Sequence, residues 1–203
     1  MIYTASPDNV VMLLGDKSME LFRTAVDGAR EDYNRYVGAF PVWAAQDCGR
    51  MTFNLIHERI WHRVVDLSED LDGLHAVEKG TTRNLHIGSQ FQVRFKLHDS
   101  AGGVVSYPTQ TALDFWAEPP ATLPSMECVN LAVGYEWDKN LGSMGRAVMS
   151  LHVSMDKPLW VIELPRIGGE GSGDISVIQG PVDGPQLPTI VMPSAPAREI
   201  GRG

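Results

Sequence analysis

The segment His57–His62 reads HERIWH and carries the residue types of a zinc peptidase, in which two histidines bind the metal and a glutamate acts as the base. In the common motif the histidines lie four residues apart and share one face of a helix. Here the spacing is one residue longer. Five helical steps rotate the chain by about 500°, so the two imidazoles diverge by about 140°. No third ligand is evident, so we expect surface or interface roles and keep a metal site at His57, Glu58 and His62 as the alternative.

Four carboxylates near the ends of expected strands raise the question of a metal-dependent nuclease: Asp114, Glu136, Asp138 and Glu163. Nucleases of the PD-(D/E)xK type need a lysine two residues after the second acid. Glu163 lacks that lysine, and Lys139 comes one position too late after Glu136. A metal-dependent hydrolase, nuclease or peptidase-like, is therefore the alternative function. The sequence has no nucleophile elbow, Walker loop or Rossmann fingerprint, so we assign no catalytic residue and expect no cofactor.

Basic and imidazole side chains gather between residues 83 and 98. In residues 90–98 apolar and polar positions alternate, which is typical of a strand with one buried and one polar face. The polar face carries Arg94, Lys96 and His98, and Arg83 and His86 precede it. This face is either ordinarily solvated or a docking surface for an acidic partner. It lacks the exposed aromatic residues on which nucleic-acid bases stack.

Histidines also fall on several expected strands: His75, His86, His98 and His152. His98 and His152 both lie on polar faces, and such faces can converge in a sheet. Scattered histidines are more often solvated or hydrogen-bonded than bound to a metal, so we expect no metal site here.

The composition is that of one globular domain. A chain of 203 residues with 43% hydrophobic residues can bury one core but is too short for two comfortable domains. The net charge of −8 opposes general attraction to nucleic acid. Cys48 and Cys128 form no disulfide framework or paired zinc motif, so we expect both to be reduced and packed. No apolar run is long enough to cross a membrane, and we expect a cytoplasmic protein.

The expected secondary structure begins with two amphipathic helices, at about Lys17–Val37 and Ala44–Leu67, because apolar residues recur there at three- and four-residue steps. From Leu74 the period changes to two, and strong turns join the strands. Consecutive hairpins indicate an antiparallel meander, because parallel strands would need helical crossovers that are not apparent. Residues 109–116 are either a short helix or an irregular strand. The sequence thus predicts one α+β domain over residues 1–164, with two N-terminal amphipathic helices packed on a mostly antiparallel sheet of about five to seven strands.

Residues 165–203 are rich in glycine and proline, and we expect a flexible, disordered tail. The tail contains the apolar segment Leu187–Met192, which could add a strand to a partner or fill a groove on it. An inert tail is the alternative.

Four strings carry a family resemblance: FNLIHERIWHRVVDL, EKGTTRNLHIG, YPTQTALDFW and VNLAVGYEWDKNLGSMGRAVMSL. Over about residues 50–164 the chain resembles an uncharacterised family of actinobacterial and phage proteins. These tend to be encoded beside a helix-turn-helix protein with an ImmA/IrrE-like zinc-peptidase domain. The resemblance implies that the chain is the antitoxin partner of such a peptidase, and it carries no catalytic motif over to these residues.

We therefore predict a non-enzymatic protein that binds and neutralises a protein partner, as the antitoxin of a toxin–antitoxin or phage-defence pair. The expected partner is the helix-turn-helix zinc peptidase, with no role for nucleic acid or membrane; a homo-oligomer is also compatible with the sequence. The candidate binding residues come from the polar strand face and from the tail: Arg83, His86, Arg94, Lys96, His98, Leu187, Ile190, Val191 and Met192.

Overall fold

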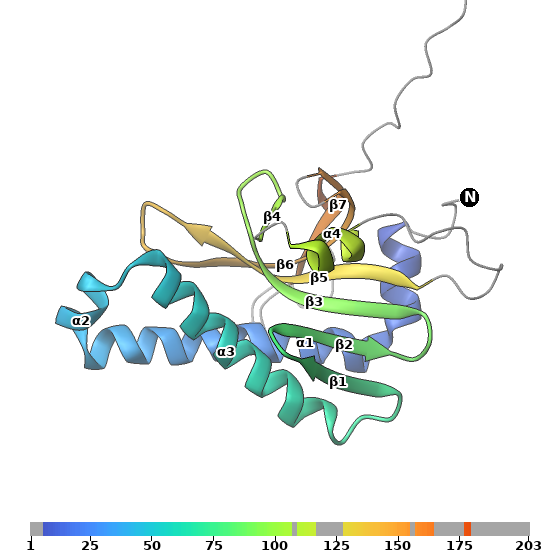
Figure 1. Cartoon of the computed structure of the whole chain (residues 1–203), viewed down its shortest axis with the longest axis horizontal. Helices are drawn as coiled ribbons and strands as arrows, with labels where there is room; N and C mark the ends of the chain where they lie inside the picture. Colours follow the sequence, from blue (N-terminus) through green and yellow to red (C-terminus); the bar gives the residue numbers. More distant parts are fainter. Residues whose placement is uncertain (1–5, 107–108, 117–127, 155–156, 165–176, 180–203) are drawn as a thin grey trace, which may run out of the picture.

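The computed structural model describes residues 6–106, 109–116, 128–154, 157–164 and 177–179 (Figure 1). Three helices come first: α1 (Pro7–Ala39), α2 (Pro41–Gln46) and α3 (Gly49–Ser68). The strands and one further helix follow in the order β1 (Leu74–Lys79), β2 (Thr82–Ile87), β3 (Phe91–His98), β4 (Val104–Val105), α4 (Gln110–Trp116), β5 (Val129–Asp138), β6 (Ser143–Ser154), β7 (Lys157–Leu164) and β8 (Val177–Gln179). The α+β class is confirmed.

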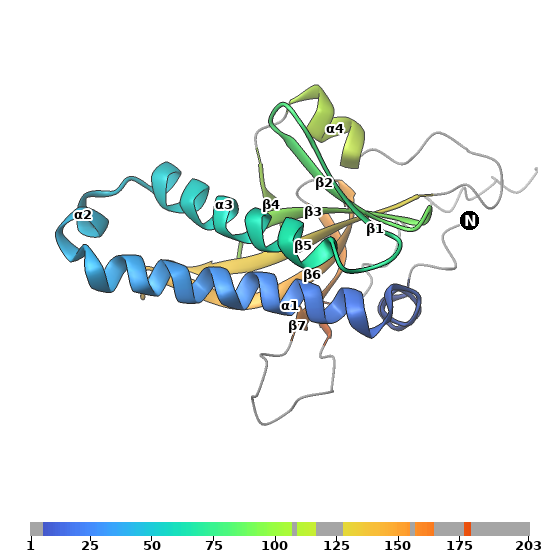
Figure 2. The same ribbon diagram turned by 90° about the horizontal axis from the view of Figure 1, so that it is seen from below.

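Helix α1 begins about ten residues before the start that the sequence pattern predicts. A kink separates its first turns from the rest, so the apolar spacing of the longer part does not continue into them. Ser6 caps the N-terminus, and its hydroxyl accepts a hydrogen bond from the Asn9 N–H at 3.4 Å. Gly15 then adopts φ 72° and ψ 164°, a backbone conformation that glycine tolerates and that interrupts the helix. The change of direction is visible near the N-terminal end of α1 in Figure 2. The expected helix from Lys17 is the part after this kink.

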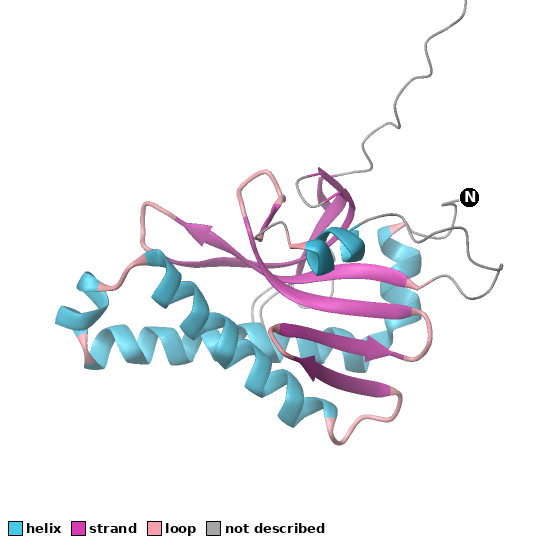
Figure 3. Cartoon of the chain, viewed as in Figure 1, coloured by secondary structure: helices cyan, strands magenta, loops and turns pink. Residues whose placement is uncertain are grey.

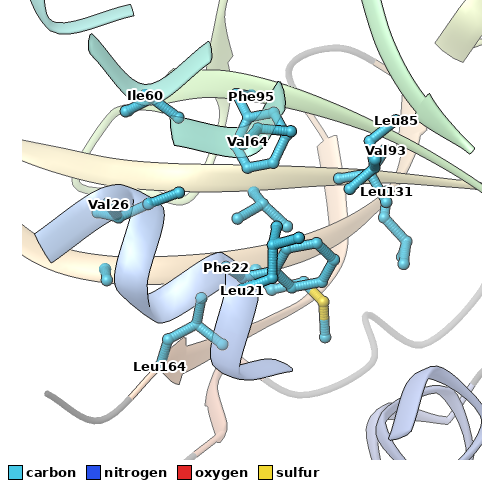
Figure 4. Close-up of a cluster of buried hydrophobic side chains, with 14 of the residues drawn as sticks. Leu21, Phe22, Val26, Ile60, Val64, Leu85, Val93, Phe95, Leu131 and Leu164 are labelled. Atoms are coloured by element: carbon cyan, nitrogen blue, oxygen red, sulfur yellow. The ribbon is translucent and has the colours of Figure 1, made fainter. Parts of the chain in front are cut away.

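The apolar faces of α1 and α3 are buried on one face of the sheet, as their spacing predicts. Phe22 and Val26 of α1, and Ile56 and Val64 of α3, have no exposed surface. They pack with strand residues such as Phe95 in a single core (Figure 4). Burial of these side chains supplies the main stabilisation of the helix–sheet interface.

The sheet has eight strands within the described residues, arranged β1-β2-β3-β5-β6-β7-β8 with β4 paired to β3. It is mostly antiparallel, as predicted, and contains more strands than expected. The prediction of a pure antiparallel meander is wrong at one place, because β3 and β5 are parallel from Phe91↔Val129 to His98↔Glu136. The connection that reverses the chain runs from Asp99 to Cys128 and contains β4 and α4.

Helix α4 lies on the face of the sheet opposite to α1 and α3 (Figures 2 and 3). A second, smaller apolar cluster forms beneath it from Val104, Phe115, Trp116 and Ala132. The parallel crossover thus covers part of the face that alternation alone marks as polar.

Strand β8 pairs with β7 and lies beyond Leu164, within the segment for which the sequence predicts a tail. The candidate tail residues Leu187, Ile190, Val191 and Met192 lie outside the described residues. Cys128 is partly buried, but Cys48 is exposed, so the expectation that both cysteines are packed is wrong for Cys48. Among the described residues, no helix is long and apolar enough to span a membrane.

Candidate functional site

Strand β3 is only partly paired along one of its edges, because the two strands on that side leave its middle residues free. On its other edge β3 pairs with β5 over its whole length. On the partly paired edge β2 pairs only with Phe91–Val93, and β4 pairs only with Leu97 and His98. Along that edge, no described strand pairs with residues 94–96. The gap between β2 and β4 opens a cleft at the edge of the sheet.

The cleft consists of two adjoining cavities that share His57, Phe95, Lys96 and Ser106. The larger, about 640 Å³, lies between α3 and the β3–β4 end of the sheet. The smaller, about 180 Å³, lies between the turn that joins β1 to β2 and the start of α4. Among the described residues that line either cavity there is no aspartate or glutamate, whereas the lining includes four basic residues: Arg50, Arg83, Arg94 and Lys96. Of these, Arg83 is paired with Glu58 and Glu78 beside the cleft.

Lys96 is the central cation of this cleft. It is partly buried, and its Nζ lies 3.4 Å from the Ser106 hydroxyl oxygen, its only hydrogen-bond partner among the described side chains. No described carboxylate lies within ion-pair distance of it. Burial lowers the pKa of Lys96, and the nearby charge of Arg94 lowers it further. An ammonium group in this position is stabilised when an anion enters the cleft.

Arg94 lines the smaller cavity beside the start of α4. Only 8% of it is exposed, although alternation placed it on a polar face. Its Nε donates to Asn84 Oδ1 at 2.8 Å, and an Nη donates to the Thr111 carbonyl at 3.2 Å. Its guanidinium lies over the ring of Phe115. Burial lowers the pKa of Arg94, but a guanidinium keeps its proton in proteins. Because neither hydrogen-bond acceptor is a carboxylate, the charge of Arg94 remains available to an anion.

Arg83 lies between two residues of the HERIWH segment, His57 and Glu58. Its guanidinium donates to Glu58 Oε1 at 2.8 Å and lies 3.3 Å from His57 Nδ1. It also binds Glu78 at 3.0 Å. A guanidinium therefore lies between the imidazole and carboxylate that would have to hold a metal, and His62 is exposed elsewhere on the helix. No group of three or more histidine, cysteine, aspartate or glutamate side chains in the described part of the chain is arranged to hold a metal ion.

His57 is neutral at pH 7. Its pKa falls to about 4, first because the ring is buried and then because Lys96 and Arg83 place positive charge nearby. Since its Nδ1 faces the Arg83 donor, this nitrogen is the acceptor and the proton is on Nε2. His57 therefore adds a polar group, but no charge, to the shared wall of the two cavities.

His98 and His152 do converge, through a serine. Ser150 Oγ lies 2.8 Å from His98 Nε2 and 2.8 Å from His152 Nε2. His98 is only 1% exposed, and burial, followed by the charge of His152, lowers its pKa to about 3. Its Nδ1 lies 3.2 Å from the Lys96 carbonyl. The His98 ring thus contacts the backbone carbonyl of Lys96. Because it is buried, His98 offers no surface to a partner.

Of the strand residues predicted to bind a partner, the structure brings Arg83, Arg94 and Lys96 together. His98 is buried, and His86 lies outside the cleft, opposite His75 and Gln92 in the sheet. Sequence reasoning missed Arg50 and His57 as wall residues, together with the hydroxyl groups that line the smaller cavity: Thr81, Thr82, Ser106, Thr109 and Thr111. Only the four threonines in TTRN and TQT carry a local signal, since clustered hydroxyls near basic residues are typical of anion sites.

The four carboxylates of the nuclease alternative do not form one cluster: two share an arginine, and the other two lie in local turns and in α4. Glu136 binds Arg146 at 2.9 Å, and Glu163 lies 3.8 Å from the same guanidinium. Asp138 accepts backbone hydrogen bonds in the β5–β6 turn, and Asp114 accepts one from Gln110 on α4. Two of the acids are thus neutralised by an arginine, and the other two stabilise local structure.

Comparison of the chain with protein-family models, with curated proteins and with solved structures found no significant match.

Proposed function

We propose that this protein is a non-enzymatic binding protein that receives an acidic segment of a protein partner in the cationic cleft. One observation carries the proposal: Lys96 lies partly buried in a cleft whose described lining holds further cations and no carboxylate. A carboxylate that enters would pair with this ammonium and relieve the cost of its desolvation.

The surrounding charges favour selectivity for such a segment. The chain as a whole carries a net charge of −8, so it repels most acidic molecules at long range. The cleft is a local exception. A partner could bind if it places one acidic segment in the cleft and is otherwise complementary to the rest of this chain's surface. A uniformly anionic polymer such as nucleic acid would be repelled over most of that surface.

The partner that we propose is the helix-turn-helix protein with a zinc-peptidase domain that the family resemblance implies. In this role the chain acts in the cytoplasm as an antitoxin, which neutralises its partner by occupying a surface that the partner needs.

Co-expression tests this proposal. The partner encoded beside the gene is produced in cells that slow their growth in its presence, together with the wild-type chain or with Lys96→Glu. We expect the wild-type chain to restore growth and to co-elute with the partner in size-exclusion chromatography. Lys96→Glu reverses the central charge and is expected to abolish both effects.

Two further variants separate docking from folding. Lys139→Glu makes the same charge change at an exposed turn residue outside the cleft and should behave as wild type. Lys96→Met removes the charge without adding a carboxylate and should fold at least as well as wild type, yet bind weakly. Equal complex formation by Lys96→Met and the wild-type chain, or no complex with the wild-type chain, overturns the proposal.

A further inference from the structure

The larger cavity combines an apolar wall with a single central ammonium group. Its wall contains ring and aliphatic carbon from three elements, α3, β3 and β5, with Val105 of β4 at the rim. Ile60, Phe95 and Tyr135 are at most 2% exposed and lie behind its wall. Phe53 and Leu97 are partly exposed, and Val105 is exposed to the cavity. The volume of about 640 Å³ lies within the range of about 300–1,000 Å³ that is usual for small-molecule sites.

The charges of this cavity match one negative charge. Lys96 lies against the apolar wall, whereas Arg50 is exposed at the solvent side of α3. His57 adds no charge at pH 7. A second negative charge buried beside the apolar wall would find no second buried cation there, so a dianion fits less well than a monoanion.

We propose that the larger cavity binds a small amphipathic carboxylate, whose apolar chain packs against Phe53, Leu97 and Val105 and whose carboxylate pairs with Lys96. Removal of the apolar chain from water favours entry, and the ion pair fixes the orientation of the ligand. An uncharged molecule of the same shape leaves the ammonium unpaired, and a short carboxylate leaves the apolar wall empty. Both parts of the ligand are therefore needed.

This inference does not rest on the proposed partner. Both cavities share Lys96, so a ligand in the larger one would occupy the same ammonium that we assign to partner docking. The test therefore uses the purified full chain alone, and its failure would leave the docking proposal standing.

The probe is decanoate, used below the concentration at which it forms micelles. Decanol, which keeps the apolar chain, and acetate, which keeps the carboxylate, are the controls. Titration calorimetry should give saturable binding of decanoate at one site, with affinity at least about tenfold higher than for decanol or acetate, a difference that one ion pair in apolar surroundings supplies. Methyl NMR signals of Ile60, Leu97 and Val105 should shift on titration, whereas those of Val177 and Ile178 on β8 should not.

Lys96→Met is the decisive variant, because methionine keeps an apolar side chain of similar length and removes only the charge. We expect its affinity for decanoate to fall at least about tenfold, towards that for decanol, while its melting temperature stays equal to or above that of the wild-type chain. Lys139→Met should bind decanoate like wild type. Equal binding of decanol and decanoate by the wild-type chain, undiminished binding by Lys96→Met, or shifts spread over both faces of the sheet would overturn the inference.

Discussion

The guanidinium carbon of Arg94 lies 4.0 Å from the centroid of the Phe115 ring, so a cation of the sheet is held against the crossover helix α4. This contact closes one side of the smaller cavity and explains why an alternating strand face is buried here. The crossover that makes β3 and β5 parallel thus also builds a wall of the cleft.

The Arg94–Phe115 contact should be measurable as stability. Phe115→Leu keeps an apolar side chain but removes the ring, so we expect a loss of about 1–2 kcal/mol in the free energy of unfolding, measured by urea denaturation. Leu113→Ala, at an exposed position of the same helix, should change it by less than about 0.5 kcal/mol. An equal effect of the two substitutions would show that the ring contributes nothing specific.

Gly134 should be intolerant of any side chain. A Cβ at this position would lie 1.8 Å from the backbone oxygen of Lys96, and backbone atoms of paired strands cannot rotate away. Gly134→Ala should therefore separate β3 from β5 and cost about 3 kcal/mol or more in the free energy of unfolding.

The control for this change is Gly38→Ala in α1, where an added Cβ meets nothing within 4 Å. Alanine favours helix, so this variant should be as stable as wild type or slightly more stable. If Gly134→Ala unfolded at the same urea concentration as the wild-type chain, the tight β3–β5 approach beside the cleft would be wrong.

Acidification should destabilise the fold through two histidines. The folded-state pKa is about 4 for His57 and about 3 for His98, and the unfolded-state value is about 6.5 for both. Below about pH 6.5 both histidines become protonated in the unfolded chain but stay neutral in the folded chain. Stability therefore falls as the pH drops from about 6.5 towards 4, by up to about 1.4 kcal/mol per pH unit for each histidine.

Urea denaturation at a series of pH values between about 7 and 4.5 measures this slope. His57→Gln removes one of the two titrations and should reduce the slope to about half. His62→Gln, at an exposed histidine further along α3, is the matched control for replacing a histidine on this helix. A slope that His57→Gln leaves unchanged would contradict the buried, neutral state of this imidazole.

The helices and most strands could be predicted because the spacing of apolar residues within each element shows which of its faces is buried. The apolar steps of Phe22, Val26, Ile56 and Val64 mark helix faces that the core indeed buries. The parallel pairing could not be predicted, since it depends on a crossover whose middle, 109–116, fits either a short helix or an irregular strand. For the same reason alternation predicts Arg94 and His98 on a polar face and does not indicate the cover that α4 and β4 provide.

The cleft itself was only partly predictable. Arg83, Arg94 and Lys96 stand close enough in sequence to suggest a basic surface. The opposite wall of the cleft comes from α3 and from the hydroxyl groups that follow β4. No local sequence pattern indicates that these segments lie beside β3. The spacing in HERIWH predicts that the two imidazoles diverge, but the position of the Arg83 guanidinium between His57 and Glu58 is known only from the fold.

The most direct test of the central claim is the dissociation constant between the purified partner and three forms of this chain: wild type, Lys96→Met and Lys139→Met. If the cleft receives an acidic segment, Lys96→Met should bind at least about tenfold more weakly and depend less steeply on salt, whereas Lys139→Met should match wild type. If Lys96→Met instead binds with wild-type affinity and wild-type salt dependence, the partner docks elsewhere and the cationic cleft is not the binding site.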